Sequence, residues 1–455
     1  MNIRQFFFLS MLATWTASYA VEAQVNPVDA TGNSSNQPSN TTANEGTLAS
    51  NNKIEKSASA QISSFDEWKS VLEHDFSQKF GQSANGKVFY AARSPVRAGA
   101  KDPSYAKQIV LSYERAMLDV QAQHVMKLYG TLTTERVLDF FNNDSSNRQQ
   151  FDDLVLNAGG DQSKVGAVFD KFLDVVQGKL DNMLIEQGVA PEDARRMPVE
   201  QKKLLFRDNF RKSVVKKAVG NMSGLVPVRT MIFTTQNRAG QYTEVWVAAV
   251  VSDNTRQFAE DLGRTRPTHV RGRPTTLESV LPEKKNDYLN ELGFRYLYDE
   301  QGVPMLLSYG RWSLISKTDD PARLAVLEDS AQETAQSIAE SYMAEFINSS
   351  LTLVSDIDVG SLSEDVAKKI SYFENKKIVG TEESVEQLKD SFDMSFKKYK
   401  ARSSFKLIGT SRVNDWKLED DNGVSHFGVV MIWSYNELKN QQNILNNRNK
   451  SDPTT

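Results

Sequence analysis

The order of elements in this chain follows from one stretch, residues 320–346, which reads DPARLAVLEDSAQETAQSIAESYMAEF. Asp320 before Pro321 is a strong helix start, because the aspartate side chain caps the first amides and proline suits the first helical position. Apolar residues then recur at spacings of three and four, which places them on one helix face. That face consists of Leu324, Leu327, Ala331, Ala335, Ile338, Tyr342 and Phe346. Its alanines predict close packing on a sheet.

Residues 102–128, DPSYAKQIVLSYERAMLDVQAQHVMKL, repeat the same pattern. A second long helix is expected to begin at Asp102 and Pro103 and to end near Tyr129. Its apolar stripe is Ala106, Ile109, Tyr113, Ala116, Val120, His124 and Leu128. A strand-like run precedes each helix, at 87–96 and at 304–315.

A β-hairpin is expected after each long helix and the further helices that follow it. The first would pair 225–235 with 241–252, and the second 405–418 with 424–434. The second turn contains Asn422-Gly423, a strong hairpin signal. Each hairpin leads into a short helix, so the order strand, long helix, helical insert, hairpin, helix occurs twice.

We therefore expect an α+β fold of two related units, each with long helices packed on a small antiparallel sheet and a helical insert. The first unit spans 63–283 with its insert at 133–223. The second spans 284–445 with a shorter insert at 352–403, and 446–455 form a tail. Any α+β chain produces some such matches by chance, but the shared Asp-Pro start and hairpin exit favour duplication.

The first 23 residues resemble a cleavable signal peptide. Arg4 supplies a positive charge, a short apolar run follows from Phe6 to Trp15, and small residues at cleavage spacing end at Ala20 or Ala23. The alternative is a membrane anchor, but the run is short of the roughly 20 residues that span a bilayer. Residues 24–62 are rich in Asn, Ser and Thr and predict a disordered linker. No other segment predicts a transmembrane helix, so export to the periplasm or the extracellular space is expected.

Composition excludes several function classes. The chain has 54 basic and 58 acidic residues, a balance that gives no overall attraction for nucleic acid. It has no cysteine, which excludes disulfides, a lipid-bearing cysteine and thiolate chemistry. The four histidines lack the spacing of a metal site, and no nucleophile-elbow or phosphate-loop motif occurs. We expect no catalytic residue, no metal and no cofactor.

The most unusual composition lies between the units, in residues 263–282. It combines several prolines with four arginines, namely Arg264, Arg266, Arg271 and Arg273. One interpretation is an anion-binding loop, since guanidinium groups grip phosphate, sulfate and carboxylate with paired hydrogen bonds. The other is a solvated connector whose arginines pair with surface acids.

Several strings resemble uncharacterised secreted proteins of Gram-negative bacteria: Leu292-Gly293-Phe294-Arg295, residues 307–313 (LSYGRWS), the stretch from Val226-Pro227-Val228 to Leu262, and Arg271-Gly272-Arg273-Pro274. More distantly, the order strand, Ala-rich helix, hairpin resembles the small outer-membrane lipoprotein domain, also found in flagellar outer-membrane ring proteins. The resemblance covers most of 84–440 and carries no catalytic residues. It implies a structural or assembly role in the cell envelope.

Three functions stay open at this point. The first is a non-enzymatic envelope protein that assembles with itself or with envelope proteins. The second is a binding module for an anionic envelope ligand, a glycan or a phosphate-bearing lipid. The third is an unrecognised periplasmic hydrolase, which needs a cleft with paired carboxylates or an activated hydroxyl.

The export signal gives the first testable prediction. Expression in a Gram-negative host should yield a mature N-terminus near Val21 or Gln24, because the small residues at 18–23 have cleavage spacing. N-terminal sequencing of the envelope fraction checks this. Retention of Met1 there would contradict it.

Overall fold

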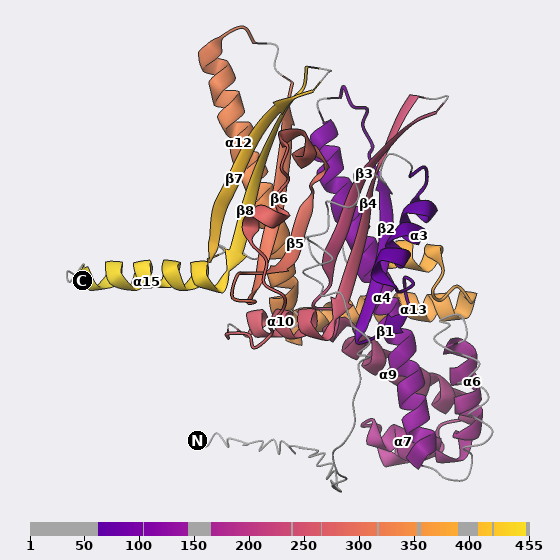
Figure 1. The fold of residues 1–455 in the computed structure, drawn as a ribbon. Coiled ribbons are helices and arrows are strands. Elements are labelled where there is room, and N and C mark those ends of the chain that lie inside the picture. Colours follow the sequence, from indigo (N-terminus) through magenta and orange to yellow (C-terminus); the bar gives the residue numbers. More distant parts are fainter. Residues whose placement is uncertain are drawn as a thin grey trace, which may run out of the picture. The chain divides into compact units, whose positions relative to one another are not determined.

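The computed structural model describes residues 62–102, 104–143, 165–237, 240–264, 266–315, 318–352, 356–389, 408–420 and 423–451 (Figure 1). The predicted signal peptide and the predicted linker, except its last residue, lie outside these ranges. Within them no helix combines the length and apolarity needed to cross a membrane.

Two four-stranded antiparallel sheets confirm the α+β class, and both have the same strand order (Figure 1). The first has the order β1-β2-β4-β3, with β1 (Ser83–Ala84), β2 (Lys87–Pro95), β4 (Gly240–Ser252) and β3 (Val226–Asn237). The second has the order β5-β6-β8-β7, with β5 (Gly293–Tyr298), β6 (Pro304–Leu314), β8 (Ser425–Ser434) and β7 (Thr410–Glu419). The two hairpins thus occupy equivalent places, as the repeat predicts.

Details of register repeat as well. A register shift separates Pro227 from Arg229 in β3, and another separates Arg412 from Asn414 in β7. Pro227 pairs with Ala249 of β4, and Arg412 pairs with Met431 of β8. Ala249 and Met431 each lie three residues before the serine that ends the strand, Ser252 in β4 and Ser434 in β8. Both serines cap the next helix: Ser252 Oγ accepts from the Thr255 amide and Ser434 Oγ from the Glu437 amide. Such agreement between two bulges and two caps supports duplication.

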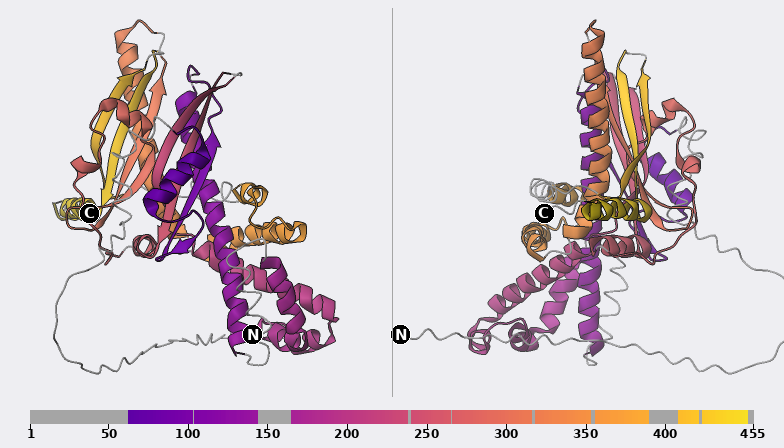
Figure 2. Two further views of the ribbon diagram at one scale, coloured as in Figure 1. Left: turned by 45° about the vertical axis from the view of Figure 1, so that its right-hand side comes forward. Right: turned by 90° about the vertical axis from the view of Figure 1, so that its left-hand side faces the viewer.

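One long helix packs on each sheet. Helix α4 (Tyr105–Asn143) packs on β2 and β4, and helix α12 (Pro321–Thr352) packs on β6 and β8 (Figure 2). The alanines allow the close packing predicted for α12, since Ala335 and Ala339 are fully buried. Gly310 of β6 completes it, because a Cβ there would clash with the Ala335 carbonyl and lie 2.6 Å from the Ala339 nitrogen. Ser308 Oγ also donates to the Ala339 carbonyl at 2.8 Å.

The opposite faces of the sheets are covered by unrelated segments. On the first sheet, helix α3 (Phe65–Phe76) packs Phe65 and Trp68 against Trp246, with ring centroids 5.6 and 5.7 Å apart. On the second sheet, the connector between the units, which we define as residues 264–292, takes this place. It contains α11 (Leu277–Val280) and η4 (Lys285–Asn290), and its Tyr288 packs on Trp416 of β7 with ring centroids 5.9 Å apart.

The helical inserts of the two units share one core. The helices are α6 (Val165–Val175), η3 (Gln177–Lys179), α7 (Leu180–Glu186), α8 (Pro191–Arg196), α9 (Val199–Gly220) and α13 (Asp356–Lys376). Phe206 and Phe210 of α9 belong to the same buried cluster as Val366 and Phe373 of α13. Helix α10 (Asp253–Gly263) of the first unit also packs on α12 of the second. The units are therefore interlocked.

Three sequence expectations need correction. Helix α4 continues to Asn143, past the predicted end near Tyr129, so residue 133 lies inside it. Strands β1 and β5 were not predicted. Helix α15 (Tyr435–Ser451) takes in residues 446–451 of the predicted tail.

The glycine contact yields a stability prediction. Gly310→Ala should lower the free energy of unfolding by about 1–3 kcal/mol, because the added methyl has no space between β6 and α12. Gly166→Ala in α6 is the control, since nothing lies within 4 Å of its Cβ, and it should not lower stability, because alanine favours a helix over glycine by up to about 1 kcal/mol. Urea denaturation measures both. Equal effects would contradict the proposed close contact.

Candidate functional site

The structure divides the four arginines of the predicted anion loop into two pairs. Arg264 Nη2 lies 2.9 Å from Glu260 Oε1, and Arg266 Nε donates to Asp261 Oδ1 at 2.5 Å. Burial works to raise the pKa of Asp261, but hydrogen bonds from Thr268, Arg266 and Gln257 hold that pKa below its ordinary value. The first two guanidinium groups therefore already have anionic partners in the last turn of α10.

Arg271 and Arg273 lie farther along the connector and are both exposed. Arg271 Nη1 donates to the carbonyls of Thr268 and Val270, at 3.0 and 2.7 Å. Gly272 between them donates its amide to the Gly302 carbonyl at 3.0 Å and lies directly on the Tyr298 ring, where a Cβ would clash. The chain is thus fixed at Gly272 while the arginine on either side is exposed.

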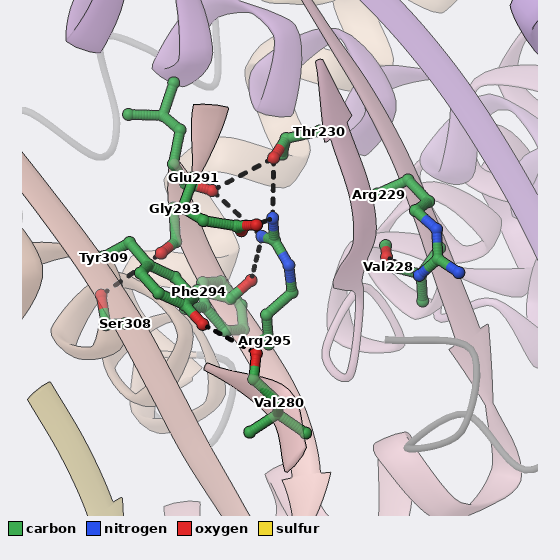
Figure 3. Close-up of polar contacts among 11 residues, drawn as sticks. Val228, Arg229, Thr230, Val280, Glu291, Gly293, Phe294, Arg295, Ser308 and Tyr309 are labelled. Carbon is green, nitrogen blue, oxygen red and sulfur yellow. Dashed lines mark hydrogen bonds and ion pairs between the residues drawn. The ribbon is translucent and has the colours of Figure 1, made fainter. Parts of the chain in front are cut away.

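A second polar cluster joins the two sheets and centres on Arg295 of β5 (Figure 3). This residue is only 3% exposed. Its Nη2 donates to Thr230 Oγ1 at 2.7 Å and to Glu291 Oε2 at 3.1 Å. Its Nη1 donates to the carbonyls of Leu292 and Phe294, at 3.0 and 3.1 Å. We call this set the Arg295 clamp.

The Arg295 clamp connects two sheet edges that lack a backbone ladder between them. Thr230 belongs to β3 and Arg295 to β5, which are edge strands of different sheets. The Thr230 hydroxyl also reaches the Leu292 carbonyl, at 3.5 Å. A planar guanidinium with several fixed donors suits such a junction, and its charge does not titrate in the ordinary range. Burial, together with nearby Glu291, raises the pKa of Tyr309 beneath it, so that phenol stays neutral.

A third cluster ties the two inserts together. Glu374 of α13 accepts from Tyr129 of α4 at 2.5 Å and from Arg211 of α9, whose Nη2 lies at 2.7 Å. Burial first, and then Glu374, raises the pKa of Tyr129. The Tyr129 phenol therefore keeps the proton that it donates, and this cluster is a structural contact.

Two of the histidines are buried. His124 of α4 is a core histidine, as expected, with Nδ1 3.0 Å from Tyr90 Oη. Burial, followed by the charge of Arg256, lowers its pKa to about 4, so it is neutral at pH 7. His426 of β8 is also buried, with Nε2 3.2 Å from Asp420 Oδ2. Within the described ranges no group of three His, Asp or Glu residues could hold a metal ion.

The hollows among the described residues include a small cavity and a charged groove. A cavity of about 20 Å³ lies between α4, α12 and β5, lined by Met117, Gln121 and Phe294, and it has room for one water. A charged groove of about 390 Å³ lies between α9 and α13, lined by Asp208, Lys212, Glu364 and Lys368. Its alternating charges select no single sign of ligand.

Sequence reasoning missed the buried arginines at 211, 295 and 311. For Arg295 the available signal was an arginine inside an otherwise apolar run, Gly293 to Tyr298. A buried charge needs a partner, so each such arginine predicts a contact to another element.

Comparison with known proteins identifies relatives of the fold. Residues 165–264, which run from α6 through α10, match a family described as a domain of unknown function, DUF6844. No curated protein matches the chain. The fold is similar to that of a hypothetical protein from Francisella tularensis, with a TM-score of 0.51, 18% identity, and coverage of 82% of this chain and 92% of that one. These matches fit an uncharacterised family. Secretion and the lipoprotein-like topology stay predictions.

The Arg295 clamp predicts a specific pattern of stability changes. Arg295→Met should cost about 3–5 kcal/mol, because it leaves the buried Glu291 carboxylate without its cation, and Arg295→Met with Glu291→Met should recover part of that loss. The control is Arg256→Met, which breaks a more exposed pair with Asp253 and should cost about 0–1 kcal/mol. Chemical denaturation gives all three values. An Arg295→Met loss no larger than that of the control would exclude a structural clamp.

Proposed function

We propose that this chain is an exported cell-envelope protein with a non-enzymatic structural, assembly or binding role. The observation that carries the proposal is that two buried arginines of the described residues lie at contacts between the two units. Arg295 joins the two sheets and Arg211 joins the two inserts. Each is engaged with a carboxylate, Glu291 for Arg295 and Glu374 for Arg211, so these groups stabilise interfaces.

The location rests on the sequence. The signal-like segment at 1–23 and the polar stretch that follows suit a body held outside the cytoplasm. Without cysteine the body depends on apolar burial, and both sheets are covered on both faces. A second copy of the chain and other envelope proteins are the expected partners, consistent with the envelope families that the sequence resembles.

A crosslinking experiment tests the main proposal. The mature chain should crosslink to itself or to envelope proteins in intact cells, and the purified protein should turn over no peptidoglycan, peptide or ester substrate. Turnover of any of these by the wild type would favour the hydrolase alternative instead.

A second candidate function is binding of an anionic envelope ligand, a glycan or a phosphate-bearing lipid. The observation that favours it is the exposure of Arg271 and Arg273 on a chain segment fixed at Gly272. A fixed backbone lowers the entropy that two guanidinium groups lose when they grip one anion. Arg264 and Arg266 contribute less to this site, because Glu260 and Asp261 already pair with them.

The two arginine pairs form a matched test of ligand binding. Arg271→Ser with Arg273→Ser should weaken binding to vesicles that contain phosphatidylglycerol, or to purified anionic envelope glycan, by about tenfold or more at low salt. Arg264→Ser with Arg266→Ser should weaken it less. Co-sedimentation at two salt concentrations measures both. If the first variant binds like the wild type, the ligand proposal fails.

A further inference from the structure

The duplication places an arginine and its partner side chain at equivalent positions of the two sheets. Lys87 pairs with Ser252 in the first unit and Met305 with Ser434 in the second. Arg93 lies six residues after Lys87, and Arg311 lies six residues after Met305. On the partner strands, Glu244 lies eight residues before Ser252, and His426 lies eight residues before Ser434. In the first unit Arg93 Nη1 lies 3.8 Å from Glu244 Oε2. The second unit therefore has a histidine where the first has the carboxylate.

The two arginines differ in burial. The Arg93 side chain is 57% exposed, beside the Phe65 ring of α3. Arg311 is only 4% exposed, because the connector covers it, and its Nη1 donates to the Leu289 carbonyl at 2.5 Å. Burial lowers the pKa of Arg311 but leaves it a cation, since an arginine side chain keeps its proton at every ordinary pH. Its charge lies beside an imidazole.

The hydrogen bonds fix the proton on that imidazole. Arg311 Nη2 lies 3.4 Å from His426 Nδ1, and a guanidinium can only donate, so Nδ1 must accept. The single proton of the neutral ring then sits on Nε2, which donates to Asp420 Oδ2 at 3.2 Å. Asp420 also holds the hairpin turn, because its Oδ1 accepts from the Val424 amide at 3.0 Å. A continuous chain of hydrogen bonds therefore runs from the Leu289 carbonyl of the connector through Arg311 of β6 and His426 of β8 to Asp420.

We propose that His426 is an acid-sensitive latch that holds the connector and the β7–β8 turn on the second sheet. Protonation makes Nδ1 a donor, so it can no longer accept from Arg311, and it places two cations side by side in a buried site. Arg311 then moves away from the imidazole and releases the Leu289 carbonyl. The connector around 284–291 loosens, and so does the contact between Asp420 and Val424.

The neighbouring groups offset the effect of protonating His426 only in part. The charges that act on His426 are Arg311 from β6 and Asp420 from the turn. The residues paired with it are Ser313 of β6 and Leu418 of β7, which are uncharged. Lys417 is engaged with Glu328 of α12 at 2.6 Å, and the connector presents the Leu289 carbonyl and the neutral phenol of Tyr288. Only Asp420 favours the protonated ring.

The direction of the pH dependence follows. Burial first, and then Arg311, lowers the pKa of His426, although Asp420 opposes this. Stability from the neutral ring is complete above about pH 6.5, the ordinary histidine pKa, and is lost as the pH falls below that value toward the folded-state pKa. The buried His124 destabilises the whole molecule in acid in the same way, so the test must be local and differential.

Hydrogen exchange of the full mature chain at pH 7.5 and pH 5.0 tests the latch, with amide rates corrected for intrinsic chemistry. In the wild type, amide protection of 284–291 and 423–426 should be lower at pH 5.0 than at pH 7.5. The loss should be about tenfold for each unit by which the folded-state pKa of His426 lies below its ordinary value, within the pH range that is crossed. His426→Gln keeps an acceptor toward Arg311 and a donor toward Asp420 but cannot be protonated. It should lose this acid response, while His269→Gln, at an exposed position of the same connector, should keep it.

His426→Asn is the second variant, because its amide also cannot be protonated in this pH range, and it should also lose the acid response. It replaces His426→Gln in the test if that variant does not fold at pH 7.5. A wild type without local loss of protection at pH 5.0 overturns the latch, and so does an unchanged acid response in the folded variant.

Discussion

The structure depends on the meeting of two sheet edges, β3 and β5, that share no backbone ladder. An edge strand carries unpaired amides and carbonyls, which are costly to bury. At this junction the Arg295 guanidinium fulfils that need, since it donates to the Leu292 and Phe294 carbonyls and to Thr230 across the gap. The sheets can then lie beside each other, and α10 of the first unit reaches α12 of the second. The inserts of the two units share one helical core, which also requires the two sheets to lie close together.

Duplication explains the features that the two units share. The units differ in the segments that cover their sheets, α3 on the first and the connector on the second. The bulges and serine caps recur because they shape the hairpin itself. The helices that follow the hairpins have diverged: Phe258 of α10 packs on Phe346 of α12, whereas Asn440, at the equivalent position of α15, is exposed. A polar face at this position suits the last repeat of a stacked pair, because repeats that stack need terminal surfaces that water can cover.

Helices, hairpins and the repeat could be predicted from the sequence because each has a local signal. Asp320 does cap α12, with Oδ1 accepting from the Ala322 amide at 2.9 Å. Strand β5 had no such signal, since all of its residues are buried and a strand covered on both faces shows no alternation. The arginine loop was recognisable by composition, but Arg264 and Arg271 have the same sequence character. Only the fold shows that Glu260 pairs with Arg264 while Arg271 stays exposed.

The chemistry of the two outer covers differs in a way that bears on function. Helix α3 is held on the first sheet by Trp68, Leu72 and Phe76, apolar contacts that do not respond to pH. The connector has apolar contacts too, but its carbonyl at Leu289 is held by Arg311, whose other partner is a titratable ring. The connector also carries Arg271 and Arg273. If both proposals hold, a single protonation would alter the mobility of the segment that presents the anion-binding side chains.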